Sequence, residues 1–246
     1  MRITIVWKNF IFFVILFISG AIKSCSEEEE INYYKLENLP DDTGGVHLRH
    51  YLGDTDAPYG YHIYLPAFYD TENIVFPLLV YYHGKGNDGN SMDDPGILDS
   101  VLRHGPHYLI VREKSWDPPY PMIVVSPQYH DNDWSTTKIK RLLDYLVDTY
   151  KVNEERIYFT GISLGAVAVW RYIAVYGDTS RIAAIVPICG SANGQPASQF
   201  LNTPVWAFHG AEDDVIEAIS SISMVEAIKS ESGGQSKSYN ISECGS

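Results

Sequence analysis

The feature that most constrains the fold is a Gly-x-Ser-x-Gly motif placed between a short apolar run and a helical pattern. Residues 157–165 read IYFTGISLG, and the residues before the motif are typical of a buried β-strand. Residues 166–173 (AVAVWRYI) follow directly as an expected helix. A strand that turns sharply into a helix crowds its own backbone, and Gly161 and Gly165 relieve the crowding because they lack a Cβ. The pattern therefore predicts a nucleophile elbow with Ser163 at its apex.

This position gives Ser163 the surroundings that a nucleophile needs. The N-terminus of the following helix presents unpaired backbone N–H groups, and the positive end of the helix dipole, to the serine. We expect the N–H of Leu164 to face a developing oxyanion. The alternative interpretation is a plain turn rich in small residues, but the strand before the motif and the helix after it favour the elbow.

Length and charge limit the remaining possibilities. The chain has 246 residues and a formal net charge of -13, with a pI near 4.9. This length suits one α/β domain once a leader is set aside. Because nucleic acid is a polyanion, so acidic a chain is not expected to bind it.

The N-terminus has the pattern of an exported lipoprotein. Basic residues precede the apolar residues 10–18 (FIFFVILFI), a run that is too short to span a membrane comfortably. Residues 22–25 (IKSC) resemble a bacterial lipobox, in which Cys25 becomes the lipidated first residue of the mature chain. We therefore expect a lipoprotein signal peptide over residues 1–24.

An acidic segment follows the lipobox. Residues 26–30 (SEEEE) resemble the acidic export tag that sends some lipoproteins to the outer face of the outer membrane, although charge patterning alone indicates only a solvated tether. We expect an acidic tether over residues 25–45 and one folded domain over residues 46–246. The expected location is extracytoplasmic, with a lipid anchor in the outer membrane and exposure at the cell surface.

Strand and helix patterns alternate along the rest of the chain. Continuous apolar runs predict central strands, an alternating run predicts an outer strand, and apolar residues at helical spacing predict helices. The expected strands are residues 61–65 (outer), 76–82, 121–127, 157–161, 182–188 and 205–208, and the expected helices are residues 96–102, 137–147, 166–173 and 215–229, with 152–156 as a linker. This alternation predicts an α/β fold with a mostly parallel sheet and helices on both faces.

The motifs occur at the expected carboxyl ends of strands, where such sheets bind ligands. They are residues 83–86 (HGKG), Pro127-Gln128, the elbow, and residues 209–213 (HGAED). This ordered set resembles α/β-hydrolase serine esterases, and most closely the polyhydroxybutyrate-depolymerase, feruloyl-esterase and phospholipase/carboxylesterase-like group. The match spans about residues 60–230.

The resemblance implies roles for further residues. The backbone N–H of Lys85 would be the second oxyanion donor beside that of Leu164, and Asp213 would be the triad acid. Asp214 is the competing acid. The resemblance implies neither a metal nor an organic cofactor.

The triad base is missing from its usual place. All eight histidines lie at or before His209, so none follows Asp213. We consider a truncated or frameshifted product that lacks the last strand and helix, a pseudoenzyme, or a base recruited from elsewhere. His130 and His107 are the conceivable substitutes, whereas His209 is expected to support the acid loop.

Cysteine and tryptophan also bear on function. The three cysteines show neither a disulfide framework nor metal-ligand spacing, and Cys189 is expected to be a small buried hydrophobe. Trp116 and Trp134 could line an acyl or sugar subsite, but packing is the favoured interpretation.

The sequence therefore predicts a serine carboxylic-ester hydrolase that acts through an acyl-enzyme on Ser163, on small or polymer-linked esters such as those of polysaccharides. Its activity is expected to be impaired because no histidine follows the acid. The alternative is a catalytically dead, hydrolase-like surface module that binds glycan or protein.

Overall fold

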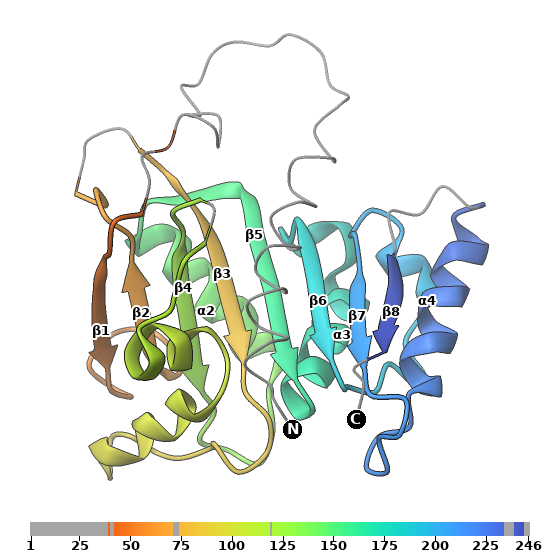
Figure 1. Cartoon of the computed structure of the whole chain (residues 1–246), viewed down its shortest axis with the longest axis horizontal. Helices are drawn as coiled ribbons and strands as arrows, with labels where there is room; N and C mark the ends of the chain where they lie inside the picture. The colour runs from red at the N-terminus through yellow and green to blue at the C-terminus, as the bar shows by residue number, and fades with distance from the viewer. Residues whose placement is uncertain (1–38, 40–41, 71–73, 119, 234–238, 244–246) are drawn as a thin grey trace, which may run out of the picture.

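The described strands of the computed structural model form one eight-stranded sheet (Figure 1). The structure describes residues 39, 42–70, 74–118, 120–233 and 239–243, the last five as backbone only. The strand order is β1-β2-β4-β3-β5-β6-β7-β8. The strands are β1 (Val46–His50), β2 (Gly60–Leu65), β3 (Phe76–Tyr82), β4 (Ile123–Gln128), β5 (Val152–Ile162), β6 (Ala184–Ile188), β7 (Trp206–His209) and β8 (Tyr239–Glu243).

The sheet is mostly parallel, as predicted. β2 runs antiparallel to both β1 and β4, and every other neighbouring pair is parallel. The expectation that the last strand is missing was wrong. Residues Tyr239–Glu243 form β8, because their extended backbone pairs with the open edge of β7.

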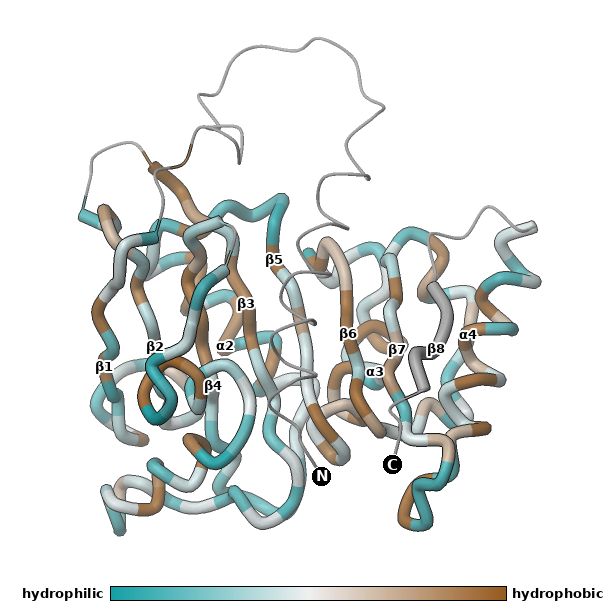
Figure 2. Tube along the Cα trace, viewed as in Figure 1, coloured by the Kyte–Doolittle hydropathy of each residue, from teal (hydrophilic) through white to brown (hydrophobic). Residues whose placement is uncertain are grey.

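One face of the sheet carries the main core. α2 (Thr136–Thr149), α3 (Leu164–Tyr176) and α4 (Ile219–Glu231) bury their apolar residues there, against alternate residues of the central strands. The other face has a smaller core that includes Leu109 of the short π-helix η3 (Tyr108–Glu113). Figure 2 shows hydrophobic residues running along β3 and β6, as expected for strands covered on both faces. The remaining short helices are η2 (Pro95–Arg103), η4 (Gly177–Thr179) and η5 (Ala197–Phe200).

Three elements differ from the sequence-based prediction. β1 was not predicted, because its alternate residues Val46 and Leu48 are exposed and leave no apolar face to recognise. β5 begins at Val152 instead of after a linker, because Val152 already pairs with Phe76 of β3. Expected strand 61–65 is not at the edge, since β1 covers it.

The carboxylate of Asp42 holds the first described residues of the domain against β2 and the residues just after it. Asp42 accepts hydrogen bonds from the hydroxyl of Tyr64, at 2.8 Å, and from the N–H of Ala67, at 3.0 Å. The Tyr64 hydroxyl in turn accepts from the N–H of Gly45 at 2.8 Å. The last residues of the expected tether therefore lie against β2.

The expected signal peptide and the expected lipidation site at Cys25 lie outside the described residues. Among the residues that are described, no helix has the length and apolar character needed to cross a membrane.

Three histidines meet where β1, β2 and the start of η3 come together. His62 Nδ1 lies 2.9 Å from His47 Nε2, and its Nε2 lies 3.1 Å from the carbonyl oxygen of Leu98. The ring of His107 lies 5.6 Å and 5.7 Å from the rings of His47 and His62, between centroids. We call His47, His62 and His107 the histidine cluster. Burial lowers the pKa of His62 to about 3 and holds the pKa of His107 well below its ordinary value.

The histidine cluster predicts a loss of stability in mild acid. The unfolded chain protonates these rings near pH 6.5, whereas the folded chain keeps His62 neutral down to about pH 3. The free energy of unfolding therefore keeps its full value above about pH 6.5. It falls as the pH drops toward 3, by roughly 1.4 kcal/mol per pH unit for each such histidine. Urea unfolding measured between pH 7 and 4 should show this slope, and His62→Gln should reduce it. An unchanged slope in His62→Gln would contradict the assignment.

Candidate active site

Ser163 lies at the apex of a strained turn between β5 and α3. Its backbone has φ 54° and ψ -119°, a region that residues with a Cβ rarely occupy. The turn is held by two backbone hydrogen bonds, from Ser163 N–H to the oxygen of Ile188 at 2.9 Å and from Val167 N–H to the oxygen of Ser163 at 3.0 Å. Leu164 begins α3, so its N–H belongs to the first turn, where backbone donors lack partners within the helix.

Gly161 and Gly165 are required by close backbone contacts. A Cβ built on Gly161 would lie 2.6 Å from the carbonyl carbon of Gly165, and one built on Gly165 would lie 2.0 Å from the carbonyl oxygen of Tyr82. These neighbours are backbone atoms of β3 and of the elbow, which cannot turn aside as a side chain can. The two glycines therefore allow β5, α3 and the end of β3 to meet at the serine.

The segment after β3 passes directly beside the serine. A Cβ built on Gly84 would lie 3.3 Å from the Cβ of Ser163. The carbonyl oxygen of Gly84 accepts a hydrogen bond from the buried His83 ring, whose Nδ1 is 2.7 Å away. Because C=O and N–H point in opposite directions across a trans peptide, the N–H of Lys85 points away from that ring. The side chain of Lys85 is exposed.

Trp134 holds the same segment from the other side. Its indole N–H donates to the carbonyl oxygen of His83 at 3.1 Å, and the side chain is only 2% exposed. Its ring packs edge-on against Tyr59, Tyr82 and Tyr129, with centroids 5.0–5.3 Å apart. The packing interpretation is therefore confirmed for Trp134, which is too deeply buried to line a subsite.

Gln128, of the Pro-Gln motif, fastens the residues that follow. Its side-chain amide lies 2.8 Å from the carbonyl oxygens of both Asn87 and Ile97 and 2.9 Å from the Ser100 hydroxyl. Ser100 also donates to the oxygen of Asn87 at 2.6 Å. All three polar side chains, those of Asn87, Ser100 and Gln128, are buried. The loop after β3 is therefore set by a polar network and does not depend on its own glycines alone.

Trp134→Phe should lower stability more than the matched substitution Trp116→Phe. The first change leaves the buried oxygen of His83 without its donor, which costs about 1–3 kcal/mol of unfolding free energy. The indole N–H of Trp116 is buried without a hydrogen-bond partner among the described residues, so its removal breaks no bond. Urea unfolding of both variants tests the difference, and equal losses would contradict the role given to Trp134.

Asp213 occupies the loop after β7. One of its carboxylate oxygens accepts hydrogen bonds from the N–H groups of Val215 and Ile216, at 2.9 Å and 3.0 Å. Partial burial by itself would raise the pKa of Asp213, but these two hydrogen bonds, with His209 and the Cys189 thiol, lower it below its ordinary value. Asp214 is exposed. The geometry thus favours Asp213 over Asp214 as the acid.

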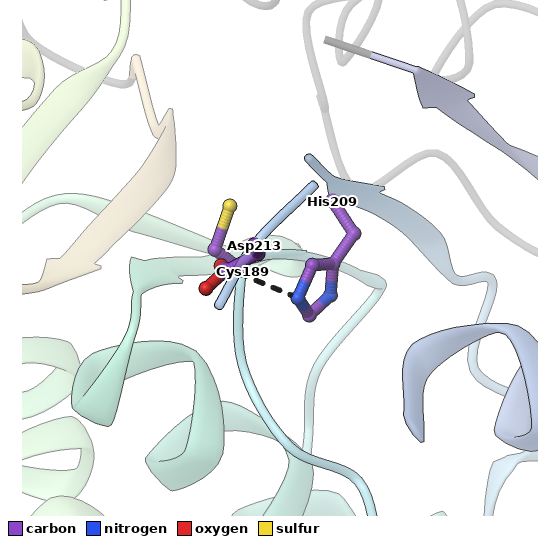
Figure 3. Close-up of side chains that lie close together, drawn as sticks. All are labelled: Cys189, His209 and Asp213. Carbon is purple, nitrogen blue, oxygen red and sulfur yellow. Dashed lines mark ion pairs between the residues drawn. The ribbon is translucent and has the colours of Figure 1, made fainter. Parts of the chain in front are cut away.

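Figure 3 shows the side chains of Cys189, His209 and Asp213 close together. His209 is fully buried, with Nε2 2.7 Å from the oxygen of Ile216 and 3.5 Å from Asp213, and Nδ1 2.8 Å from the hydroxyl of Ser221. Both ring nitrogens are therefore engaged in holding the loop. Cys189 is half-buried, with its backbone at φ 50°, and its thiol interacts with Asp213, a contact that the expectation of a simple buried hydrophobe did not include.

Ser163 and Asp213 lie at the same edge of the sheet, and contacts of Cys189 connect them. The oxygen of Ile188, bonded to the N–H of Ser163, belongs to the peptide that joins Ile188 to Cys189. The Cys189 thiol then contacts the carboxylate of Asp213. The candidates for nucleophile, oxyanion loop and acid therefore lie at the same edge of the sheet.

The candidate bases are held elsewhere. The Nε2 of His130 lies 3.4 Å from Lys138 Nζ and 3.6 Å from Asp131, and the Nδ1 of His107 lies 2.7 Å from the Ser126 hydroxyl within the histidine cluster. In the described part of the chain, no hydrogen bond joins the Ser163 hydroxyl to a histidine. A cavity of about 430 Å³ is also remote from the elbow, since residues such as Glu154, Arg181 and Ala183 line it near the amino ends of β5 and β6.

Matches to known proteins come from solved structures. No protein-family model matches the chain, and no curated protein matches it. Among solved structures, a thermostable esterase is 25% identical with a TM-score of 0.60, covering 83% of this chain and 56% of that one. The chain thus spans little more than half the length of that esterase.

For two further structures, the aligned share of this chain is similar to the aligned share of the other chain. A mutant of the feruloyl esterase module from Clostridium thermocellum, complexed with sinapinate, is 17% identical with a TM-score of 0.54, and 90% of each chain is covered. The carboxylesterase Cest-2923 from Lactobacillus plantarum WCFS1 is 15% identical with a TM-score of 0.52, covering 80% of this chain and 82% of that one. The chain has the α/β-hydrolase fold, and its structural neighbours are esterases and carboxylesterases.

Proposed function

We propose that the protein is a serine carboxylic-ester hydrolase that forms an acyl-enzyme on Ser163. The observation that carries the proposal is the strained backbone of Ser163 at the apex between β5 and α3, with the His83–Lys85 segment in contact beside it. This is the arrangement that presents a serine hydroxyl next to backbone donors. The likeness to a thermostable esterase supports the reaction type.

The chemistry would proceed in two halves. The Ser163 oxygen attacks the ester carbonyl carbon, and the N–H groups of Leu164 and Lys85 stabilise the resulting oxyanion. The alcohol leaves with a proton, and water then hydrolyses the acyl-serine to free the acid. Each oxyanion donor contributes on the order of 3 kcal/mol to lowering the barrier.

Turnover by these 246 residues is proposed to be slow. The proton of Ser163 needs an acceptor, and His209, the histidine nearest the acid in sequence, has both nitrogens engaged. Loss of the triad histidine in a serine protease reduces turnover by about a million-fold. Asp213 remains positioned to orient an imidazole if one is supplied.

Fluorophosphonate labelling tests whether Ser163 is activated. The protein should gain the mass of one phosphonyl group, located on Ser163 by peptide mapping, and Ser163→Ala should remove it, while Ser115→Ala leaves it in place. Labelling that persists in Ser163→Ala, or no labelling of a folded protein, would count against the proposal.

A specific observation favours a second candidate. Because no hydrogen bond joins the Ser163 hydroxyl to a histidine among the described residues, the second candidate is a non-catalytic, hydrolase-like surface module that binds glycan or protein. A folded protein that fluorophosphonates do not label, and that nevertheless binds a polysaccharide, would support this candidate.

The substrate and location are part of the same proposal. Ester groups linked to polysaccharides, such as acetyl or feruloyl esters, suit a lipid-anchored protein on the cell surface, and one structural neighbour is a feruloyl esterase module. The anchor is proposed to be a lipid on Cys25 after removal of residues 1–24. Mass spectrometry of the mature N-terminus tests it, since an unmodified Cys25 or cleavage at another position would end the anchor proposal.

A further inference from the structure

Three side chains with metal-ligating atoms meet at the carboxyl ends of β6 and β7. Ile188 of β6 and Phe208 of β7 are partners in the parallel register, so Cys189, just past the end of β6, lies beside His209, the last residue of β7. The N–H of Cys189 also donates to the oxygen of Phe208 at 2.7 Å. The following turn brings Asp213 back to them, with its N–H 3.3 Å from the oxygen of Gly210.

Their ligand atoms are close enough for one small ion. A sulfur, a ring nitrogen and a carboxylate oxygen, one from each residue, all lie within 4.8 Å of one another. Two ligands of a tetrahedral zinc ion lie about 3.3–3.6 Å apart, given metal–ligand bonds of about 2.0–2.3 Å. The separation of His209 Nε2 and Asp213 Oδ2 is already 3.5 Å. Only modest movement would complete the set (Figure 3).

Without an ion, a neutral His209 ring cannot satisfy all of its hydrogen bonds. Two of its contacts need an N–H donor, and a neutral ring has only one. The Ser221 hydroxyl has a single hydrogen, and the oxygen of Gly190, 3.1 Å away, can only accept it. The hydroxyl must then accept from Nδ1–H of His209. The oxygen of Ile216 requires a second N–H, on Nε2.

The ring can donate in both of these contacts only with an N–H on each nitrogen. A neutral ring leaves one contact unsatisfied. With a cation on Nε2, Nδ1–H keeps its bond to Ser221 and Ser221 keeps its bond to Gly190, while the oxygen of Ile216 gives up its contact with the ring. This is the outer-shell hydrogen bonding that normally orients a metal-bound histidine.

We propose that Cys189, His209 and Asp213 bind a divalent transition-metal ion of the zinc class. The donors are a thiolate, an imidazole nitrogen and a carboxylate, a combination that suits zinc and cobalt better than calcium or magnesium. Binding releases the thiol proton of Cys189 and the proton on Nε2 of His209, and it exchanges the contact of Nε2 with Ile216 for a metal bond. Three protein ligands leave a fourth position for water.

The site would couple metal binding to the proposed activity. Asp213 is the acid of the proposed triad, so an ion that holds its carboxylate would keep it from orienting a base. This consequence rests on the proposed function. The metal site itself does not, since its ligands do not include Ser163.

Cobalt binding tests the site without any hydrolysis assay. Co²⁺ is titrated into the reduced, metal-free protein. We expect one equivalent to produce tetrahedral visible bands and a near-ultraviolet band from thiolate-to-cobalt charge transfer, and Zn²⁺ to bleach both. Cys189→Ser should abolish the charge-transfer band, whereas the matched variants Cys25→Ser and Cys244→Ser should retain it. Ser221→Ala should retain the band and weaken binding about 10- to 100-fold.

A second measurement covers the case in which a variant does not fold. In the unmutated protein, Zn²⁺ should protect Cys189 from alkylation by iodoacetamide, as read by peptide mapping, and should leave the alkylation of Cys244 unchanged. Absence of both the charge-transfer band and the protection in the folded protein would overturn the proposal, as would a band that persists in Cys189→Ser. A protein that binds cobalt in this way but resists fluorophosphonates would retain the metal site and lose the esterase function.

Discussion

Gly165→Ala is expected to destabilise the protein by more than about 3 kcal/mol, or to prevent folding. The added Cβ would lie 2.0 Å from the carbonyl oxygen of Tyr82, 2.5 Å from its carbonyl carbon and 2.7 Å from the oxygen of His83. Alanine in a helix is better than glycine by about 1 kcal/mol, so the clash must exceed that gain. The clash should outweigh the gain because each of these atoms belongs to the backbone of β3 or of the His83–Lys85 segment.

Urea unfolding of Gly165→Ala against Gly210→Ala measures this effect. A Cβ on Gly210 would meet no atom within 4 Å, so the control should stay within about 0.5 kcal/mol of the unmutated protein. A Gly165→Ala variant as stable as the control would mean that β3 and α3 do not approach at the elbow as described.

Ester hydrolysis by a protein of these 246 residues is expected to be slow, to depend on Ser163, and to increase when imidazole is added. The site presents a serine and a carboxylate, and among the described residues no imidazole is hydrogen-bonded to the serine hydroxyl. A positioned general base contributes about 10²–10⁴-fold, so added imidazole should raise the Ser163-dependent rate by at least about tenfold.

The measurement is the initial rate of p-nitrophenyl butyrate hydrolysis with and without imidazole, after subtraction of the rate of Ser163→Ala, which removes catalysis by imidazole in solution. Asp213→Asn should reduce the imidazole-dependent part, because the acid orients the base. Rapid Ser163-dependent turnover without imidazole would contradict the account and indicate an unidentified base, and His130→Ala would then be the first variant to make.

The parts of the fold that the sequence predicts are those with a strong local pattern. Continuous apolar runs identify β3 and β6, and the helical spacing of residues 137–147 identifies α2. The elbow is predictable because steric crowding at Gly161 and Gly165 leaves so few residues that fit. β1 is not, since its burial depends on pairing with β2 and its own residues alternate without an apolar face.

The site is predictable only in part, for a related reason. Ser163 and Asp213 are marked by motifs, but the partners of Asp213 are set by the register between β6 and β7. Cys189 and His209 lie far apart in the sequence, without metal-ligand spacing, and become neighbours only because their strands end together. Likewise, the hydrogen bond from Trp134 to His83 joins two loops, and its residues carry no local signal.

The central claim is that Ser163 forms an acyl-enzyme. Deacylation needs the same general base as acylation, so a site that lacks this base should accumulate the intermediate when it is mixed with an activated ester. Intact-protein mass spectrometry after incubation with p-nitrophenyl butyrate measures this directly. The account predicts the added mass of one butyryl group, located on Ser163 by peptide mapping and missing from Ser163→Ala. An adduct on another residue, or none in a folded protein that also resists fluorophosphonates, would contradict it.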